Sequence, residues 1–361
     1  MTNRISTERL CSQRLTQGAL RRPADVVAWF GAVQAQEYGP AKWALALRMK
    51  SDTLDASVTQ AFDEGLILRT HVMRPTWHFV TPGDIRWLLD LTAPQIRRRM
   101  APYERALELD TRTITRGIRL IERALGGRRF LMRSELADRL ESAGLGLRGQ
   151  RLGHLMMHAE LNAVVCSGPR RGKQFTYALL EERAPGGKPL ARDQAVAELT
   201  RRYFRSHGPA TTRDFMWWSG LTAADAKRGL EMIHARPVDL DGKRYWRTGQ
   251  APRGALSSEL AHLLPIYDEY LVAYRDRQAV PHGPGVSGFK DGASVTFQNA
   301  LVIAGHVAGT WRVSPYKSGL RLQLTPLRTL TLIERRATLA AVSRHERFLS
   351  CRIEATITGR A

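Results

Sequence analysis

Two carboxamide side chains stand two positions apart near the start of the chain. They are Gln34 and Gln36, and a carboxylate, Glu37, follows directly. Each carboxamide offers two hydrogen-bond donors and an acceptor in fixed directions, so the pair can hold a water molecule in place for attack on an electrophile. The spacing alone also fits a structural role, because glutamines near a helix end often bond carbonyl groups that the helix leaves unpaired.

The chain carries a large excess of positive charge. Among its 361 residues, 55 lysines and arginines stand against 34 aspartates and glutamates, which gives a net charge of +21. Such an excess favours a polyanionic partner, with nucleic acid ahead of an anionic membrane surface. The alternative is a surface that merely uses arginine freely. A hydrophobic share of 43% and a charged share of 25% are typical of a folded globular protein rather than a disordered one.

The cysteines, Cys11, Cys166 and Cys351, lie far apart and form no Cys-x-x-Cys pair. Neither a zinc ribbon nor a disulfide framework is indicated, and a reducing compartment fits. Glycine-rich nucleotide-binding motifs and the serine-hydrolase motif do not occur in the context that they require. The first residues lack the apolar core of a signal peptide, and no apolar run approaches the roughly 18 residues of a membrane helix. We therefore expect a cytoplasmic, nucleoid-associated monomer without metal or cofactor.

The first part of the chain has the pattern of a winged helix. Apolar residues at helical spacing predict helices up to about residue 17, over 24–36 and over 54–64. The second of these would place Gln34 and Gln36 at its end, with Gly39 and Pro40 as its stop. Aromatic and β-branched residues over 67–80, with a central Arg-Pro, predict a β-hairpin. Three helices followed by a hairpin are the plan of a winged helix.

The same order of elements recurs twice. In the first recurrence, a hairpin with a basic turn at 168–173 follows helical patterns over 111–126, 133–143 and 148–161. In the second, a hairpin around 238–245 with an Asp241-Gly242 turn follows helical patterns over 193–206, 211–219 and 222–233.

The remainder of the chain has a different pattern. Strands are predicted over 294–297, 300–303, 306–313 and 320–324, then a helix over 326–344 and a strand over 351–357, which together suggest a mostly antiparallel sheet. The fold class is therefore α+β, mainly α, with three tandem winged-helix motifs and a C-terminal β-containing module. The predicted domains are 1–105, 106–185, 186–252 and 253–361.

Several of these motifs resemble those of a known family. Two segments resemble motifs of the bacterial winged-helix DNA glycosylases of the AlkZ and YcaQ type. They are Gln34-Ala35-Gln36 with residues 39–44, and the hairpin over 71–79. Further matching motifs lie at 207–211, 214–215, 217–221, 264–270 and 305–312. They follow in the family's order from about residue 26 to residue 312, so the resemblance covers most of the chain.

The resemblance implies a C-shaped DNA-binding scaffold of three winged helices. It also implies monofunctional hydrolysis of the N-glycosidic bond of N7-alkylated purines in double-stranded DNA, including the unhooking of interstrand crosslinks. The family's catalytic motif is glutamine, an aliphatic residue, then glutamine or aspartate, and this chain has the first form with Ala35 in the middle. On this basis Gln34 and Gln36 orient the water at C1′, with Glu37 as an electrostatic supplement at most.

Basic and aromatic side chains on two hairpins are the candidates for contact with DNA. The expected DNA-binding residues are Lys42, His71, Arg74, His78, Arg170, Arg171 and Lys173. Trp77 and Phe79 fit a core position better than a platform for stacked bases. No carboxylate or cysteine accompanies His71 and His78 at ligand spacing, so a metal site is not expected.

Two other interpretations remain open at this stage. Adjacent carboxylates, Asp268 and Glu269, suggest a paired-carboxylate mechanism, but we expect them to be structural and to pair with arginines of a winged-helix unit. The whole chain could also be a non-catalytic winged-helix DNA-binding protein, such as a transcription regulator, or a structural nucleic-acid chaperone. Three such units with a further module exceed what a dimeric operator-binding protein needs.

Overall fold

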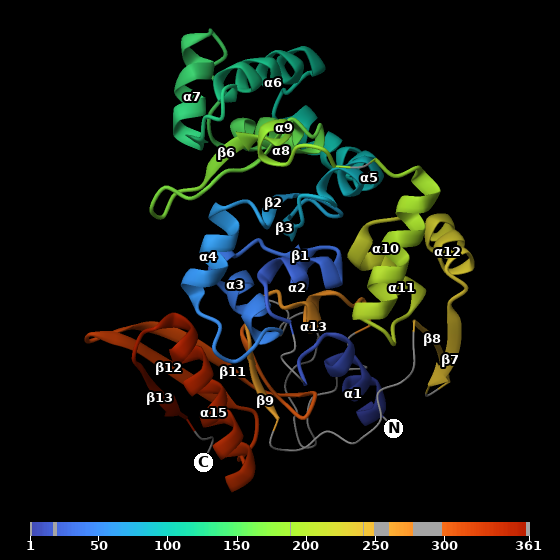
Figure 1. Ribbon diagram of the computed structural model, residues 1–361, viewed down its shortest axis with the longest axis vertical. Coiled ribbons are helices and arrows are strands. Elements are labelled where there is room, and N and C mark those ends of the chain that lie inside the picture. Colours follow the sequence, from blue (N-terminus) through green and yellow to red (C-terminus); the bar gives the residue numbers. More distant parts are fainter. Residues whose placement is uncertain are drawn as a thin grey trace.

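The computed structural model describes residues 2–16, 20–187, 189–240, 242–248, 260–276 and 298–358. In Figure 1 the elements between residues 111 and 183 form the top of the molecule, the helices between residues 192 and 232 lie on the right, and the red C-terminal part lies at the lower left. The elements that carry the N-terminal glutamines lie between these three parts. The fold is a mixture of helices and small open sheets, as the sequence predicts.

The first unit contains the two glutamines. Its elements are α1 (Thr2–Ser12), α2 (Pro23–Phe30), β1 (Val33–Gln34), α3 (Tyr38–Leu47), α4 (Asp55–Asp63), β2 (Leu68–His71) and β3 (Trp77–Val80). The predicted hairpin over 67–80 and the helix over 54–64 are confirmed. β1 adds to the hairpin as an edge strand, so the sheet has the order β1-β3-β2.

The prediction of a helix over 24–36 is wrong in its second half. α2 ends at Phe30, because Gly31 takes a positive φ of 89° that breaks the helical path. The chain then runs extended and pairs Val33 with Phe79. Gly39 and Pro40 are not a stop either, since they lie in the first turn of α3, where proline has no helical hydrogen bond to lose.

A long helix, α5 (Ile85–Ala106), joins the first unit to the second. It was not predicted, and the two prolines inside it, Pro94 and Pro102, weaken its sequence signal. In the described ranges no helix, α5 included, has the length and the apolar run that crossing a bilayer requires.

The second and third units follow the predicted order. The second has α6 (Thr111–Leu125), β4 (Leu131–Met132), α7 (Arg133–Ser142), α8 (Gly149–Leu161), β5 (Val165–Ser167), β6 (Thr176–Leu179) and α9 (Leu180–Arg183). The third has α10 (Arg192–Ser206), α11 (Thr212–Ser219), α12 (Ala223–Met232), β7 (Arg236–Leu240) and β8 (Lys243–Arg247). All six predicted helices and both hairpins are confirmed, whereas Asp241 of the predicted turn lies outside the described residues.

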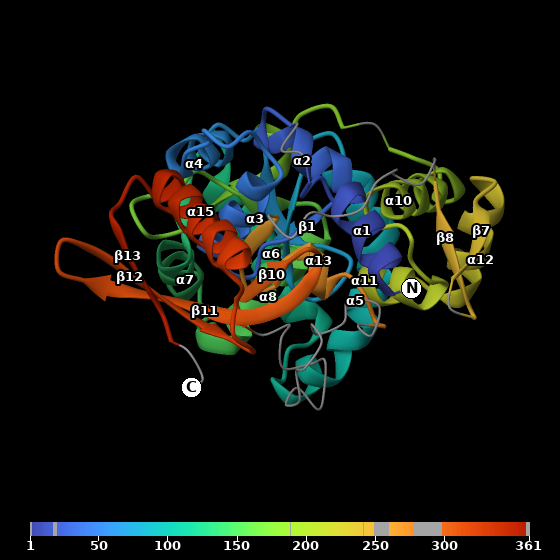
Figure 2. The same cartoon turned by 90° about the horizontal axis from the view of Figure 1, so that it is seen from below.

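The C-terminal part is a five-stranded sheet of order β13-β12-β11-β10-β9, antiparallel except between β12 and β13. Its elements are β9 (Ala261–Leu264), α13 (Glu269–Val272), β10 (Ala300–Ile303), β11 (His306–Tyr316), β12 (Gly319–Pro326), α15 (Leu332–Leu349) and β13 (Ile353–Ile357). The mostly antiparallel sheet is confirmed, and the strand predicted over 294–297 lies outside the described residues. Figure 2 shows α15 lying across the sheet.

Two separate hydrophobic cores meet at β1. The first core packs the first unit against the C-terminal sheet and includes Val33 and Ala35. The second core packs the hairpin and α5 against the third unit and includes Ala32. Consecutive residues thus belong to different cores, and this fixes the backbone that leads into the glutamine pair from both sides.

Buried histidines make the first core sensitive to acid. Burial lowers the pKa of His262, on β9, to about 3 and that of His345, on α15, to about 4. Both are therefore neutral when folded, whereas the unfolded chain takes up protons below about pH 6.5, so stability is lost as the pH falls from there toward 4.

We expect the free energy of unfolding to fall between pH 7 and pH 5 by about 2 kcal/mol for each such histidine. Urea denaturation at several pH values measures this loss. His262→Leu should flatten the pH dependence by about one proton, and an unchanged slope in that variant would contradict the assignment.

Candidate active site

The glutamine pair lies on an extended edge of the first sheet. Gln34 pairs with His78 across the ladder, and the Ala35 amide donates to the Trp77 carbonyl at 2.8 Å. Ala35 is fully buried in the first core. Successive side chains of an extended chain point to opposite faces of the sheet. Because Ala35 points into the first core, the flanking Gln34 and Gln36 point to the other face.

The two carboxamides are held by the turn itself. The Oε1 atom of Gln34 accepts from the Gln36 amide at 3.1 Å, and the Oε1 atom of Gln36 accepts from the Trp77 amide at 3.4 Å. Gln34 is 6% exposed and Gln36 is half-buried. Within the described part of the chain neither Nε2 group makes a hydrogen bond. The arrangement fixes both side chains while leaving donors for a small polar ligand.

Arg69, on β2, binds the same turn from the other side. Its guanidinium donates to the carbonyls of Ala35 at 2.9 Å and Gln36 at 3.3 Å, and lies 4.3 Å above the Trp77 ring. Burial lowers its pKa to about 10, so it stays charged at neutral pH. Sequence reasoning missed this residue. The feature that could have indicated it is an arginine at a position of the predicted hairpin where the alternation places side chains inward.

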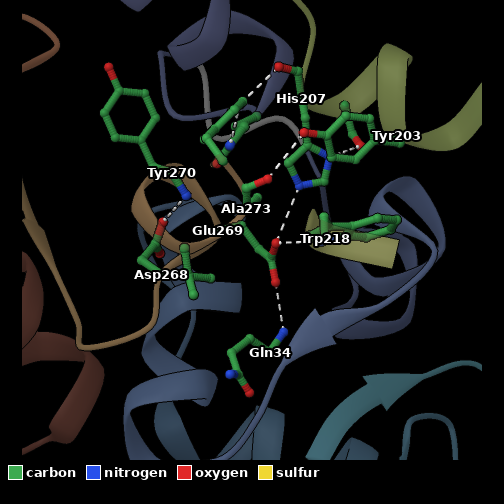
Figure 3. A network of polar contacts seen from close by, with 12 residues as sticks. Gln34, Tyr203, His207, Trp218, Asp268, Glu269, Tyr270 and Ala273 are labelled. Atoms are coloured by element: carbon green, nitrogen blue, oxygen red, sulfur yellow. Dashed lines mark hydrogen bonds and ion pairs between the residues drawn. The ribbon is translucent and has the colours of Figure 1, made fainter. Parts of the chain in front are cut away.

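A buried carboxylate holds the backbone beneath the glutamines. Glu269, only 1% exposed, accepts from the Gln34 amide at 2.7 Å. Its other oxygen accepts from Trp218 Nε1 at 2.9 Å and His207 Nε2 at 3.3 Å (Figure 3). Burial acts to raise the pKa of Glu269, but the bonds from His207 and from the Gln34 amide outweigh it and lower the pKa. Glu269 is therefore an ionised carboxylate that contacts the turn through its backbone.

The two adjacent carboxylates have different partners. Asp268 forms a two-bond ion pair with Arg48, at 2.8 Å for each bond, and caps α13. That pairing agrees with the expected structural role. Glu269 instead joins the third unit to β1, a connection that sequence reasoning missed although it singled out the motifs around His207, Trp218 and Glu269. Glu37, the carboxylate next to the pair in sequence, is exposed at the start of α3.

Lys42 and His78 face inward in this structure, and both are buried. The Lys42 ammonium bonds Asp55 at 2.6 Å and Thr59 at 2.8 Å, and only 8% of its side chain is exposed. His78 is fully buried, and burial together with Arg74 lowers its pKa to about 3, so it is neutral. Each was expected to contact DNA because spacing alone does not reveal a buried partner.

Of the other expected DNA-binding residues, His71 is also buried, whereas Arg74 and Arg170 are half-buried and Arg171 and Lys173 are exposed. His71 is bonded through its ring to Glu160 of α8, and Arg74 is half-buried 5.8 Å from the Trp217 ring. Arg170 stacks over Tyr38, at 4.8 Å from its ring. The loop between β5 and β6 carries two exposed cations, Arg171 and Lys173, and projects from the second unit in Figure 1.

Metal binding finds no support in the described ranges, where no group of three histidine, cysteine, aspartate or glutamate side chains is arranged to hold an ion.

Replacing Glu269 by glutamine tests how the turn is held. A carboxamide has one acceptor oxygen, yet donors approach both oxygens of Glu269, so at least one donor is left unpaired. We expect a loss of about 1–3 kcal/mol in the free energy of unfolding and faster hydrogen exchange of the amides at 33–36. Denaturant titration and exchange mass spectrometry measure the two effects.

Asp268→Asn is the matched control, because this adjacent carboxylate is equally buried but bonds Arg48 instead of β1. It should lower stability and leave exchange at 33–36 unchanged. Equal exchange in both variants would contradict the role given to Glu269.

Comparison with known proteins supplies the family. The family model described as "DNA glycosylase AlkZ-like" matches residues 27–348. The curated "Interstrand DNA cross-link repair glycosylase" of Streptomyces sahachiroi is 25% identical over 319 residues, which cover 80% of this chain and 82% of that protein. The solved structure of Streptomyces sahachiroi DNA glycosylase AlkZ shares the fold, with a TM-score of 0.80 over 99% of each chain and 22% identity. Since the family model spans most of the sequence, this chain belongs to the AlkZ-like DNA glycosylase family.

Proposed function

We propose that this protein is a monofunctional glycosylase that hydrolyses the N-glycosidic bond of N7-alkylated purines in double-stranded DNA and unhooks interstrand crosslinks. Family membership supplies the reaction class. The printed name of the Streptomyces sahachiroi relative, an interstrand cross-link repair glycosylase, supports the second part. The observation that carries the proposal is the pair of carboxamides held at the end of an edge strand and in the turn that follows it, Gln34 and Gln36.

The chemistry of the lesion suits such a neutral site. A purine alkylated at N7 carries a positive charge and leaves the sugar without prior protonation, so no general acid is needed. The remaining task is to place a water molecule at C1′ of a sugar with oxocarbenium character, and orientation alone contributes much of the rate in such a step. Gln34 and Gln36 orient that water, because their Oε1 atoms are fixed by the turn and their amide groups remain available.

Hydrolysis without a covalent enzyme intermediate also fits the surroundings of the pair. An amine nucleophile would have to be free and close to C1′. Lys42, the lysine nearest along the chain, has its ammonium bonded to Asp55 and Thr59. This supports water rather than lysine as the attacking group.

The DNA would be held beside this turn by the tip of the second hairpin. Arg171 and Lys173 are exposed there, and the Arg170 amide anchors the loop to Asp63 at 2.7 Å. Arg170 also stacks on Tyr38, two residues after Gln36, so the cationic tip and the glutamine pair are neighbours. We propose that Arg74, Arg171 and Lys173 contact phosphates. His71 and Arg170 instead position the hairpins. Lys42 and His78, which are buried, are not proposed as DNA contacts.

Gln36→Ala tests the catalytic assignment. Removing a fixed group that orients the attacking water should reduce release of 7-methylguanine from duplex DNA by at least about a hundredfold, while affinity for that DNA changes little. Base release is measured by cleavage of the resulting abasic sites, and affinity by fluorescence anisotropy. Glu37→Ala, next in sequence but exposed, is the control and should retain activity.

Undiminished excision by Gln36→Ala would end the assignment. Tight, sequence-dependent binding with no base release by the unmodified protein would instead favour a non-catalytic DNA-binding protein.

Arg171→Ala combined with Lys173→Ala tests the DNA contact. A plot of log affinity against log salt concentration has a slope whose size falls by about 0.9 for each phosphate contact that is lost. The slope of the double variant should therefore be smaller by about 1.8. The rate of base release from fully bound DNA should stay the same. The control is Arg335→Ala combined with Arg336→Ala. Both arginines are exposed on α15, so this variant removes two positive charges at a site away from the second hairpin. An equal change of slope in both double variants would show that only net charge matters.

A further inference from the structure

The glutamines and the third unit lie on the same side of the first sheet. Across the sheet, Gln34 pairs with His78 and His78 pairs with Thr70, so these side chains share one face. Leu68 and Val80, each two positions along a strand from this row, belong to the second core together with the third unit. The face that carries Gln34 therefore points toward α10 and α11.

The turn of the first hairpin is held against α11. This helix ends at Ser219, and the next residue, Gly220, has a positive φ of 72° that glycine adopts without strain. A Cβ atom at Gly220 would lie 2.4 Å from the Met73 carbonyl oxygen, so the two backbones approach each other closely. The Met73 amide also donates to Thr92 Oγ1 of α5 at 3.0 Å. Two helices thus fix the turn that leads into β3.

Two arginines from distant parts of the chain converge on one ring of α11. The Trp217 indole has the Arg74 guanidinium 5.8 Å from its centre and the Arg275 guanidinium 5.4 Å from it. Arg74 belongs to the hairpin turn, and Arg275 follows α13. The ring is fixed because its Nε1 donates to the Val272 carbonyl at 3.0 Å. A guanidinium that stacks on a ring keeps its in-plane N–H donors available for a further ligand.

The charge of Arg275 is not neutralised by a neighbour. Its side chain is exposed, and in the described ranges its guanidinium makes no hydrogen bond or ion pair. The nearby carboxylate, Asp214, is occupied by backbone groups. Its Oδ1 accepts from the amides of Arg275 and Asp276, at 2.8 and 2.9 Å, and its Oδ2 accepts from the Thr211 amide at 2.9 Å. These bonds hold the backbone of Arg275 in place and leave its side chain to bind an anion.

The charge of Arg74 acts on the face that carries the glutamines. Burial, and after it the charge of Arg74, lowers the pKa of His78, which pairs with Gln34. Two cations beside one ring repel each other, and an anion that binds both removes this cost. Arg74 and Arg275 therefore form a site for an anion at the edge of the glutamine face.

We propose that Arg275, together with Arg74, binds a backbone phosphate of the damaged DNA strand next to the lesion. A phosphodiester has two charged oxygens in the geometry that guanidinium groups bind through parallel N–H bonds. The strand would then be held by the first hairpin and by the segment after α13 at once. The inference rests on the proposed function, which supplies damaged DNA as the ligand, and adds Arg275 and Trp217 to the residues that hold it.

Neutralising single phosphates is the sharpest test. A methylphosphonate removes the charge of one phosphate and nearly keeps its shape. Each duplex of a set carries one such group, at successive positions on both sides of a 7-methylguanine whose 2′-fluoro sugar blocks hydrolysis. Affinity is measured by anisotropy. The unmodified protein should lose about tenfold in affinity at the phosphate that the arginines bind.

Arg275→Gln should bind the unsubstituted duplex about tenfold more weakly and should no longer respond to the methylphosphonate at that position. The other substituted positions should weaken this variant as they weaken the unmodified protein. Arg335→Gln, exposed on α15, removes the same charge elsewhere and should respond normally to every position. The proposal is overturned if no position loses its effect in Arg275→Gln.

Trp217→Leu tests whether the ring positions the guanidinium. It removes the stacking surface and keeps an apolar side chain, and circular dichroism checks that the variant folds. In the Trp217→Leu background, Arg275→Gln should weaken binding by at most about threefold, because the guanidinium is no longer held for the phosphate. A full tenfold loss in that background overturns the role given to Trp217.

The outcome is separate from that of the proposed function. If the protein releases no base from a duplex with 7-methylguanine on an ordinary sugar, the proposed function fails. The phosphate map made with the blocked duplexes still decides whether Arg275 contacts the DNA.

Discussion

The Glu269 carboxylate is the contact on which the glutamine turn depends. Removing a carboxylate from water costs several kcal/mol unless donors replace the lost solvent. Here the donors come from β1, α11 and the end of α10, so the charge is stabilised only when all three elements are in place. The same requirement makes the position of β1 precise, because a shifted strand would leave the charge short of a partner. Arg69 adds a second fixed charge on the opposite side of the turn.

Packing reinforces this electrostatic constraint. Ala32 belongs to the core shared with the third unit, and Val33 to the core shared with the C-terminal sheet. Native cores are close-packed, so neither side can relax without moving the strand between them. A site that works by orienting water, with no acid, metal or covalent nucleophile among its proposed groups, needs this rigidity, because small errors in position remove most of its effect.

The sequence predicts the repeating plan of helices and hairpins well, since periodicity and turn residues are local signals. It fails where structure is set by distant partners. β1 has two residues and pairs with a strand more than forty positions away, so the apolar run before it looked like a continuing helix. Lys42 and His78 looked available because nothing in their spacing indicates burial or the Asp55 partner. Glu269 was noticed but given the wrong kind of partner, because only the folded chain brings His207 and Trp218 to it.

The separation of the partners along the chain has a consequence for biosynthesis. The Gln34 amide and the Glu269 carboxylate are 235 residues apart, so the acceptor is synthesised long after the strand that it holds. Domains fold progressively as a chain emerges from the ribosome, whereas contacts this distant form late. The basic hairpin of the second unit is complete well before that point. A nascent chain therefore completes this hairpin before it contains the carboxylate that holds the Gln34 strand, so the glutamine turn becomes fully ordered only when the last module has docked.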